Sequence, residues 1–324
     1  MQFSRRHLAA AVAGAVWLLR ASIASAEPYP SRPIRILVPY TAGGGVDLIA
    51  RAVAEPLGKR LKQPVIIENK PGANGVLATQ EVARSAADGH TLVIGVPATI
   101  AINPSLYKLS FDPIKDLRPV AQLAIARFVI VTAPSSGIQS LQQLIAQAKA
   151  NPGKYSYASY GNGSAPHLAG QMLTTTAGVD INHIPYKGST AALFDVISGR
   201  VSFMFDVVAN VQQHVQAGTL KVIAAAGEQA PPQFPNVPTA QSVVPGLALD
   251  GWVGVFAPVG TPAAVVNRLS TELNEVLKEQ GLKRRLTDLG FDVVGSTPEQ
   301  LLETIRKDHA TYTKAVQSAG LRNE

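Results

Sequence analysis

Short apolar runs and helical apolar repeats alternate along most of the chain. In the first hundred residues this rhythm predicts strands at 34–38, 65–67 and 91–96 and helices at 46–61 and 76–84. Strands that alternate with amphipathic helices are typical of a parallel sheet covered by helices on both faces. Pro56 lies inside the first helical repeat, and we expect it to kink that helix.

The same alternation returns in the middle of the chain. It predicts strands at 129–131, 155–158, 183–185, 201–205 and 221–225 and helices at 141–150, 165 onward, 189–198 and 207–216. Ser140 and Gln143 have the spacing of a capping box at the start of one of these helices. Residues 230–245 are rich in proline and follow neither periodicity, which indicates an irregular connection.

The last part of the chain is mainly helical. A strand is predicted at 252–257, and two helices begin at Thr261-Pro262 and Thr297-Pro298. This tail has too few strands to form its own domain, so we expect it to pack on the first block. The sequence therefore predicts two α/β lobes joined by two crossover segments with a cleft between them, one lobe from 27–127 plus 253–324 and the other from 128–252.

The first residues of the chain have the features of an export signal. Arg5 and Arg6 precede an apolar run from Ala9 to Leu19, and Ala24-Ser25-Ala26 forms a small-residue cleavage site. The run is shorter than the roughly 20 residues that span a bilayer. We predict a signal peptide at 1–26, a periplasmic location and either general-secretion or twin-arginine export. Cleavage would remove three arginines and no acid, which lowers the net charge from +7 to +4.

Several kinds of chemistry find no support in the sequence. The chain has no cysteine, which excludes disulfides and thiolate chemistry. It has no Gly-x-Ser-x-Gly, no phosphate-binding loop and no zinc-type pair of histidines. Gly43-Gly44-Gly45 follows a strand, but Leu48 occupies the position of the third glycine of a dinucleotide site. We therefore predict no metal, no cofactor and no nucleic-acid partner.

What recurs instead is a glycine-containing loop between a strand and a helix. Four such loops lie at 39–47, 69–75, 158–166 and 186–190. Backbone N–H groups at the start of a helix bind anions, and glycine lets a carboxylate approach closely. Any one loop alone is more simply a helix start. Four of them at the carboxyl ends of strands, facing one cleft, indicate a binding site for a small organic carboxylate.

Two acidic residues in this region can each have either a structural role or a role in ligand binding. Asp47 lies in the first turn of its helix, where it either stabilises the helix start or contacts ligand. Asp206 ends a strand and either accepts hydrogen bonds from ligand or water or caps the helix that follows.

The motifs together resemble the Bug family of periplasmic solute receptors, the extracytoplasmic component of tripartite tricarboxylate transporters. The resemblance covers residues 29–320. Its main carriers are Val38-Pro39-Tyr40-Thr41-Ala42-Gly43-Gly44-Gly45-Val46-Asp47, Glu68-Asn69-Lys70-Pro71-Gly72-Ala73-Asn74-Gly75, Asp88-Gly89-His90-Thr91-Leu92, Ser159 to Ser164, His183-Ile184-Pro185-Tyr186-Lys187-Gly188 and Ala257-Pro258-Val259-Gly260-Thr261-Pro262.

The resemblance implies a two-lobed type II periplasmic-binding-protein fold that closes on a carboxylate. It implies capture by the loops at 40–44 and 159–164, partly through water, and delivery to an integral membrane partner. The candidate ligand-binding residues are Tyr40, Thr41, Ala42, Gly43, Gly44, Asp47, Asn74, Thr99, Ser159, Gly161, Asn162, Ser164, Lys187 and Asp206. Lys187 matches a family motif in which it is either a ligand contact or structural. From their positions, Ile100, Arg127 and Phe128 are expected to set specificity, Arg127 through a second carboxylate and Phe128 through an aromatic ligand.

The leading hypothesis is a monomeric, non-enzymatic receptor that captures a small carboxylate, with a dicarboxylate or an aromatic carboxylate as candidates, and delivers it to membrane subunits. A sensor that presents ligand to a membrane signalling protein is the alternative that the sequence does not separate from transport. A secreted enzyme on the same scaffold is a third hypothesis, and it lacks an activated nucleophile, a metal or an acid–base pair.

Overall fold

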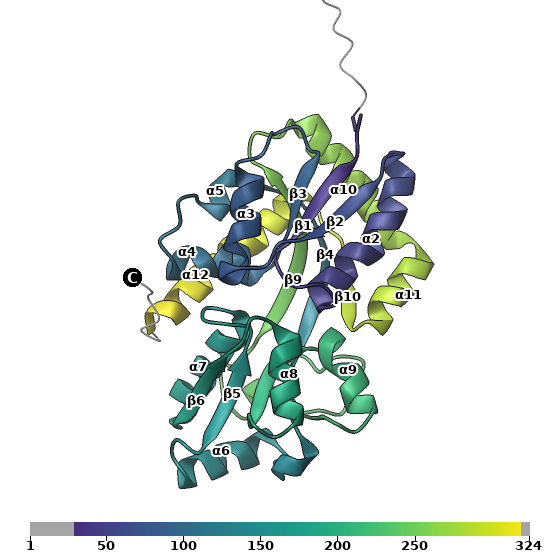
Figure 1. Ribbon diagram of the computed structural model, residues 1–324. Helices are drawn as coiled ribbons and strands as arrows, with labels where there is room; N and C mark the ends of the chain where they lie inside the picture. Colours follow the sequence, from purple (N-terminus) through teal and green to yellow (C-terminus); the bar gives the residue numbers. More distant parts are fainter. Residues whose placement is uncertain (1–28, 319–324) are drawn as a thin grey trace, which may run out of the picture.

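The computed structural model describes residues 29–318, and the predicted signal peptide at 1–26 lies outside this range. The chain forms two α/β lobes, one above the other, connected by two long strands that run between them (Figure 1). Each lobe contains a curled sheet with helices on both faces, so the α/β architecture expected from the alternating pattern is confirmed.

The first lobe is built on a six-stranded mixed sheet. Its strands are β2 (Val65–Asn69), β1 (Ile34–Val38), β3 (Thr91–Gly95), β9 (Asp250–Pro258), β4 (Leu117–Thr132) and β10 (Phe291–Val293), in that order. β1 is parallel to β2 and β3, but β9 is antiparallel to β3 and β4, and β10 is antiparallel to β4. The parallel arrangement predicted from the first three strands is confirmed for β1, β2 and β3, and the sheet is mixed because β9 and β10 come from the returning C-terminal part of the chain.

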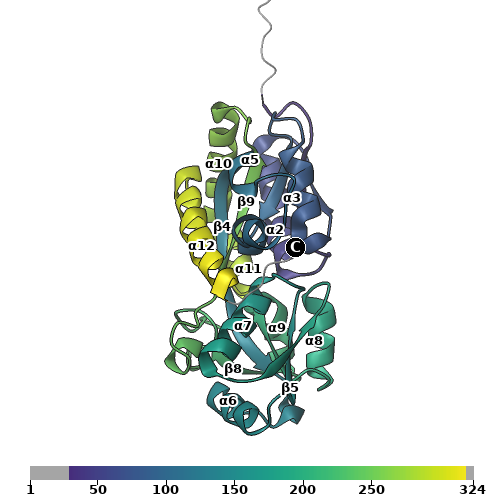
Figure 2. The same cartoon turned by 90° about the vertical axis from the view of Figure 1, so that its left-hand side faces the viewer.

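Helices cover both faces of this sheet. The helices on one face are α2 (Gly45–Leu61), α10 (Ala263–Lys278) and α11 (Gln280–Asp288), and those on the other are α3 (Val76–Ala83), α4 (Asn103–Leu106), α5 (Pro113–Asp116) and α12 (Pro298–Ser318). Figure 2 shows the second group from the side. β1 shows why both faces need cover, since Ile36 and Leu37 point in opposite directions and each joins a separate buried cluster.

The second lobe repeats this plan with the end of β4. Its other strands are β5 (Tyr155–Ser159), β6 (Ile181–Pro185), β7 (Phe203–Val207) and β8 (Lys221–Ala225). One face is covered by α6 (Leu141–Ala150) and α7 (Ala165–Ala177), and the other by α8 (Ser189–Ile197) and α9 (Val208–Gln216). β5 is parallel to β6 and β7, whereas β4 is antiparallel to β7 and β8.

One strand belongs to both sheets. β4 pairs with β9 as far as Arg127, which lies opposite Asp250, and pairs with β7 from Phe128, which lies opposite Val207. The first crossover segment is therefore a continuous strand, and the start of β9 is the second. The predicted lobe boundaries at 127/128 and 252/253 stay a prediction, but the change of pairing partner occurs between Arg127 and Phe128.

Local signals in the sequence differ in how well they predicted the elements. The capping signal of α6 is confirmed, because Ser140 Oγ accepts a hydrogen bond from Gln143 N–H at 3.1 Å. Pro56 lies inside α2, which continues through it to Leu61. The sequence did not predict α11, β10 or the first twelve residues of β4, whose apolar positions follow no simple period.

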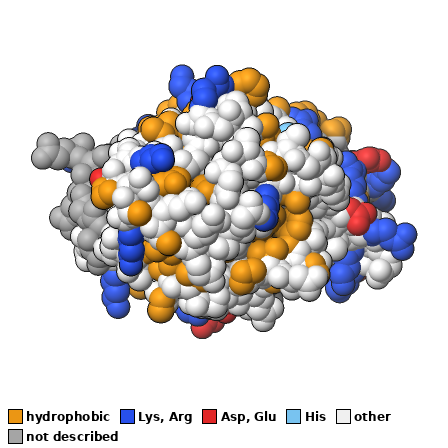
Figure 3. Space-filling model, turned by 90° about the horizontal axis from the view of Figure 1, so that it is seen from below, with side chains coloured by type: hydrophobic (Ala, Val, Ile, Leu, Met, Phe, Trp, Pro, Cys, Tyr) orange, Lys and Arg blue, Asp and Glu red, His pale blue; other side chains and the backbone are white. Residues whose placement is uncertain are grey.

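Within residues 29–318, no helix combines the length and apolarity needed to cross a membrane. Seen from below, the molecule carries Lys and Arg side chains at several places, partly in small groups near its edges, with hydrophobic side chains between them (Figure 3).

Candidate functional site

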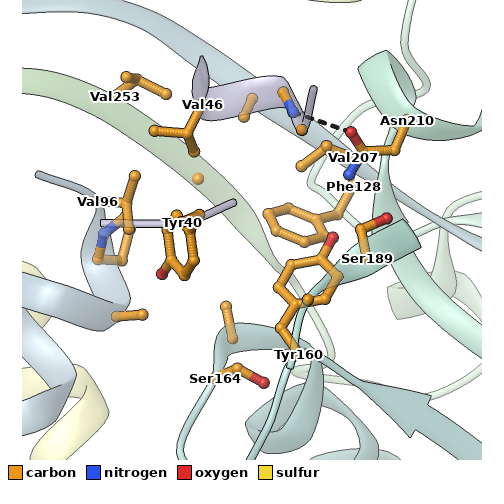
Figure 4. Close-up of a pocket in the computed structure, with 18 of the residues that line it drawn as sticks. Tyr40, Val46, Val96, Phe128, Tyr160, Ser164, Ser189, Val207, Asn210 and Val253 are labelled. Carbon is orange, nitrogen blue, oxygen red and sulfur yellow. Dashed lines mark hydrogen bonds between the residues drawn. The ribbon is translucent and has the colours of Figure 1, made fainter. Parts of the chain in front are cut away.

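A cavity of about 100 Å³ lies where the two lobes meet, and both lobes contribute to its wall (Figure 4). The first lobe provides Tyr40, Thr41, Gly44, Gly45, Val46, Val96, Pro97, Ala98, Ala126, Gly251, Trp252, Val253 and Phe291. The second provides Phe128, Tyr160, Ser164, Ala165, Gly188, Ser189, Thr190, Val207 and Asn210. Three of the four predicted glycine loops, at 39–47, 158–166 and 186–190, meet here.

Three helices begin at the cavity wall. Gly44, Ser164 and Gly188 are the N-cap residues of α2, α7 and α8, and none of them caps its helix with a side-chain hydrogen bond. The first N–H groups of a helix lack intrahelical acceptors, and the helix dipole makes this end positive. Three uncapped helix starts around one cavity therefore favour an anionic ligand group.

No Lys, Arg, His, Asp or Glu lines the cavity in the described part of the chain. Recognition of a negative charge on the ligand would therefore depend on backbone N–H groups. Within residues 29–318 there is also no group of three His, Cys, Asp or Glu side chains arranged to hold a metal ion.

Asp206 lies directly behind the wall and is completely buried. Its carboxylate accepts hydrogen bonds from Tyr160 Oη, Ser189 Oγ at 2.5 Å, Asn210 Nδ2 at 2.7 Å and Val207 N–H at 2.7 Å. Burial raises the pKa of Asp206 to about 6, although the hydrogen bonds oppose the rise. Asp206 therefore orients the side chains that form the wall rather than forming the wall itself.

The two lobes are hydrogen-bonded to each other on both sides of the cavity. Gly45 N–H, at the start of α2, donates to Asn210 Oδ1 on α9 at 3.0 Å (Figure 4). Tyr107 Oη of the first lobe donates to the carbonyl of Asn162 in the second at 2.7 Å. These contacts hold the lobes in a closed arrangement around the cavity.

Asp47 supports the first glycine loop from behind. It is 2% exposed, and it accepts hydrogen bonds from Gly43 N–H, Arg51 Nε and Asn69 Nδ2, each at 2.9 Å. Burial acts to raise the pKa of Asp47, but the hydrogen bonds, led by that from Arg51, outweigh it and lower the pKa. This geometry corresponds to the structural interpretation of Asp47, since its partners are the glycine loop, its own helix and the end of β2.

The histidine pair His167 and His183 supports the glycine loop at 158–166. Ser159 Oγ lies 2.7 Å from His183 Nε2, and Gly163 N–H donates to His167 Nδ1 at 3.0 Å. The two imidazole rings stack with centroids 4.0 Å apart, and burial lowers the pKa of both to about 4. Ser159 is fully buried and also hydrogen-bonds to Gly161, so it shapes the loop from outside the cavity wall.

The predicted site residues divide into two groups. Tyr40, Thr41, Gly44 and Ser164 line the cavity. Those outside its wall are Ala42, Gly43, Asp47, Asn74, Thr99, Ser159, Gly161, Asn162, Lys187 and Asp206. Asn74 is instead paired with Asn103, and Thr99 Oγ1 with the backbone of Val96.

The three residues expected to set specificity have different surroundings. Phe128 lines the cavity, whereas Ile100 is buried in the core against Gly95. The guanidinium of Arg127 is held by Asp250 at 2.5 Å and by Asp292 at 2.7 Å. Successive residues of a strand face opposite sides, so Arg127 points away from the cavity that Ala126 and Phe128 line. The expectation that Arg127 binds a second carboxylate does not fit this geometry.

Several wall residues were not among the predicted ones. Tyr160, Gly188, Ser189 and Thr190 lie in the predicted loops, so the loop signal was sufficient to find them. Others come from distant parts of the chain without a local signal, and they include Trp252, Phe291 and Asn210.

Two α/β lobes that share a strand and enclose a cavity lined by helix starts define a solute-binding protein of the type II periplasmic fold. The chain belongs to the tripartite tricarboxylate transporter family receptors, whose pattern matches residues 49–321. It is therefore a solute-binding receptor, and the resemblance to the Bug family is confirmed.

Relatives and solved structures agree with this assignment. Protein BugT of Bordetella pertussis (strain Tohama I) is 35% identical over 301 residues, which cover 92% of each chain. An R. palustris protein solved with adipate has a TM-score of 0.86 and 31% identity, covering 90% of this chain and 98% of its own. MatC from Rhodopseudomonas palustris with bound malate has a TM-score of 0.83 and 30% identity, covering 89% and 100%.

Proposed function

We propose that this receptor captures a small organic carboxylate between its lobes and delivers it to a membrane transporter. The observation that carries the proposal is the convergence of three uncapped helix starts, those of α2, α7 and α8, on one cavity. Adipate and malate in the related structures are both carboxylates, which supports this ligand class.

The proposed binding mode follows from the free donors at the cavity. A carboxylate would accept from first-turn N–H groups of α7 and α8 and from those of α2 other than Gly45 N–H, which already donates to Asn210 Oδ1, with hydroxyls of Thr41 and Thr190 within the same wall. Closure of the second lobe over the ligand, with β4 and the start of β9 as the hinge, would remove it from water. The predicted residues outside the wall, Asp206 and Asp47 above all, would act by holding these loops in place.

Calorimetry and thermal shift with a panel of carboxylates test the proposal. We expect at least one carboxylate to bind and to raise the melting temperature, because a ligand that binds only the folded state stabilises it. The matched neutral amide should have no effect. If no mono-, di- or aromatic carboxylate stabilises the protein, the proposed ligand class is wrong.

Export to the periplasm and cleavage after Ala26 form part of the proposal. Amino-terminal sequencing of protein from the periplasmic fraction of the host should begin at Glu27. Co-purification with integral membrane subunits in the presence of ligand would support delivery to a transporter, and capture of a membrane kinase instead would contradict it. We propose a monomer, which light scattering can test.

A further inference from the structure

We propose that Leu106 and Tyr107 of the first lobe position the glycine loop at 158–166 of the second lobe, so that this loop is completed only when the lobes close. The inference deepens the proposed function and rests on it, because the start of α7 in this loop would help to hold the carboxylate. It gives a role in ligand affinity to two side chains that lie outside the cavity wall.

The loop receives two contacts from the first lobe, whose helix α4 lies above α7 in Figure 1. Tyr107 Oη donates a hydrogen bond to the carbonyl of Asn162 at 2.7 Å, and Leu106 packs against Gly163. A Cβ atom at Gly163 would lie 2.2 Å from Leu106 Cδ1, so the leucine occupies the space that a larger residue would need. Gly163 also has a φ of +75°, a conformation that favours glycine. Backbone shape and packing therefore both favour glycine where the loop meets the first lobe.

These contacts act next to the residue that starts α7 at the cavity. Ser164 is the N-cap of α7, lines the cavity and follows Gly163 directly. Within the second lobe, Gly163 N–H donates to His167 Nδ1 at 3.0 Å, and Ser164 N–H donates to the carbonyl of Gly161 at 3.2 Å. Glycine at 161 and 163 gives this backbone more conformational freedom than other residues would. Contacts from the first lobe at Asn162 and Gly163 would therefore restrict that freedom and hold the first N–H groups of α7 in place.

The first lobe presents the two side chains on a firmly held support. They lie at the end of α4, whose first residue, Asn103, is fully buried. Asn103 Nδ2 donates to the carbonyl of Asn74 at 3.0 Å, and Asn74 Nδ2 donates to Asn103 Oδ1 at 2.8 Å. On another side, Ser105 Oγ lies 2.6 Å from Thr313 Oγ1 of α12. The support belongs to the first lobe, so it reaches the loop when the lobes close, and Asn74 would act on the site through α4.

The affinity for ligand would then include the free energy of closure, because only the closed arrangement has both contacts with the loop. Loss of either contact should weaken binding although no group that touches the ligand has changed. Changes at an interface mostly alter the dissociation rate, so the weaker binding should appear there.

Calorimetry and stopped-flow fluorescence on the receptor test the inference with adipate, malate and benzoate as probes. Trp252 lines the cavity, and the other tryptophan, Trp17, lies in the predicted signal peptide, so the fluorescence of the processed receptor reports on the site. For the probe that binds most tightly, Tyr107→Phe should raise Kd about three- to tenfold, the effect of one hydrogen bond. The dissociation rate should rise, while the association rate and the melting temperature of the unliganded protein stay unchanged. Tyr155→Phe is the matched control, since Tyr155 Oη donates to Gln147 Oε1 at 3.1 Å within the second lobe.

Two glycine variants separate the contact between the lobes from backbone strain. Gly163→Ala should raise Kd at least about tenfold, because its methyl group would meet Leu106. Gly178→Ala, at the other end of α7, is the control, since its φ is +61° and its Cβ would meet nothing within 4 Å. Both variants should lose stability, but only Gly163→Ala should bind weakly. Leu106→Ala in the Gly163→Ala background should restore part of the affinity, because it removes the atom that the methyl group meets.

The outcomes distinguish this inference from the proposed function. Equal Kd values for Tyr107→Phe and Tyr155→Phe, or no recovery from Leu106→Ala, would overturn the inference and leave the carboxylate site intact. If no carboxylate binds the native protein, the proposed function and the inference both fail. If Gly163→Ala does not fold, the comparison of the two tyrosine variants still decides the question.

Discussion

At the scale of single residues, Asp206 shows how a charged group can serve a site without facing the ligand. Its carboxylate holds the Tyr160 hydroxyl, Ser189 and Asn210, so three parts of the wall depend on one buried acid. Among residues 29–318 no Lys or Arg pairs with it, and burial raises its pKa to about 6. The pKa of Tyr160 is raised as well, first by burial and then by the Asp206 charge, which keeps the hydroxyl protonated as a donor.

Replacement of Asp206 should reveal this pKa as a pH dependence of stability. Between pH 3.8 and about 6 the folded protein binds more protons at Asp206 than the unfolded chain does. The stabilisation from protonation is complete below 3.8 and is lost as the pH rises through 6. The unfolding free energy of the native protein minus that of Asp206→Asn should therefore fall with pH in this window, by at most about 1.4 kcal/mol per unit.

The difference between the two proteins is the quantity to measure by urea unfolding, because other groups titrate in the same range. His167 and His183, with pKa values lowered to about 4, act in the opposite direction and lose stability as the pH falls from 6.5. They contribute equally to both proteins and cancel in the difference. A difference that does not change between pH 4 and 6.5 would show that Asp206 titrates normally.

At the scale of elements, the important feature is where the helices begin. α2, α7 and α8 come from two lobes, and their starts converge because each follows the carboxyl end of a strand. Gly45, the first residue of α2, lies where the backbone of the first lobe meets the second lobe. A Cβ atom there would lie 3.3 Å from Phe291 Cζ and 3.4 Å from both Ala209 Cβ and Val207 Cγ2.

Gly45→Ala should therefore weaken ligand binding by impeding closure. The contact with Phe291 Cζ is tight enough that a neighbour must move by a few tenths of an ångström, and the two contacts with the second lobe lie at the limit of ordinary van der Waals contact. We expect Kd to rise about three- to tenfold, while the stability of the unliganded protein changes by less than about 1 kcal/mol. Gly281→Ala on α11 is the control, because its Cβ would meet nothing within 4 Å. Equal Kd values for the two variants, measured by calorimetry, would show that Gly45 does not limit closure.

At the scale of the whole molecule, the crossing between the lobes is stabilised by charge. Arg127 on β4 pairs with Asp250 on β9 and with Asp292 on β10, at the point where β4 leaves one sheet for the other. The guanidinium is 18% exposed and the two carboxylates are 24% and 28% exposed. Burial raises the pKa of Asp250, and Arg127 opposes this.

Arg127→Ala should lower the free energy of unfolding by about 2–3 kcal/mol at neutral pH, because it leaves two partly buried carboxylates without a counter-charge. The control is Arg32→Ala, which removes an exposed pair with Asp88 and should change stability by less than about 1 kcal/mol. Urea unfolding of both variants measures the difference. Equal losses would show that the crossing does not depend on this cluster.

Much of this architecture was predictable from local sequence. Apolar periodicity predicted most strands and helices, and the glycine loops predicted three places, near Tyr40, Ser164 and Ser189, that form the cavity. The pattern missed β10 and most of β4, and although it predicted the strand β9 it did not predict that β9 pairs antiparallel with its neighbours. Antiparallel return of the tail depends on contacts between distant segments, and local periodicity carries no information on it.

By itself, the sequence determined the α/β character, the glycine-rich helix starts and the absence of thiol chemistry, because each depends on residue type and spacing within a short segment. Only the tertiary structure decided which face of β4 lines the cavity. It placed Phe128 in the cavity wall and Arg127 on the opposite face, brought in Phe291 from the tail and set Asp206 behind the wall. These outcomes depend on strand alternation combined with long-range pairing, since a side chain acquires its partners only when distant segments pack together.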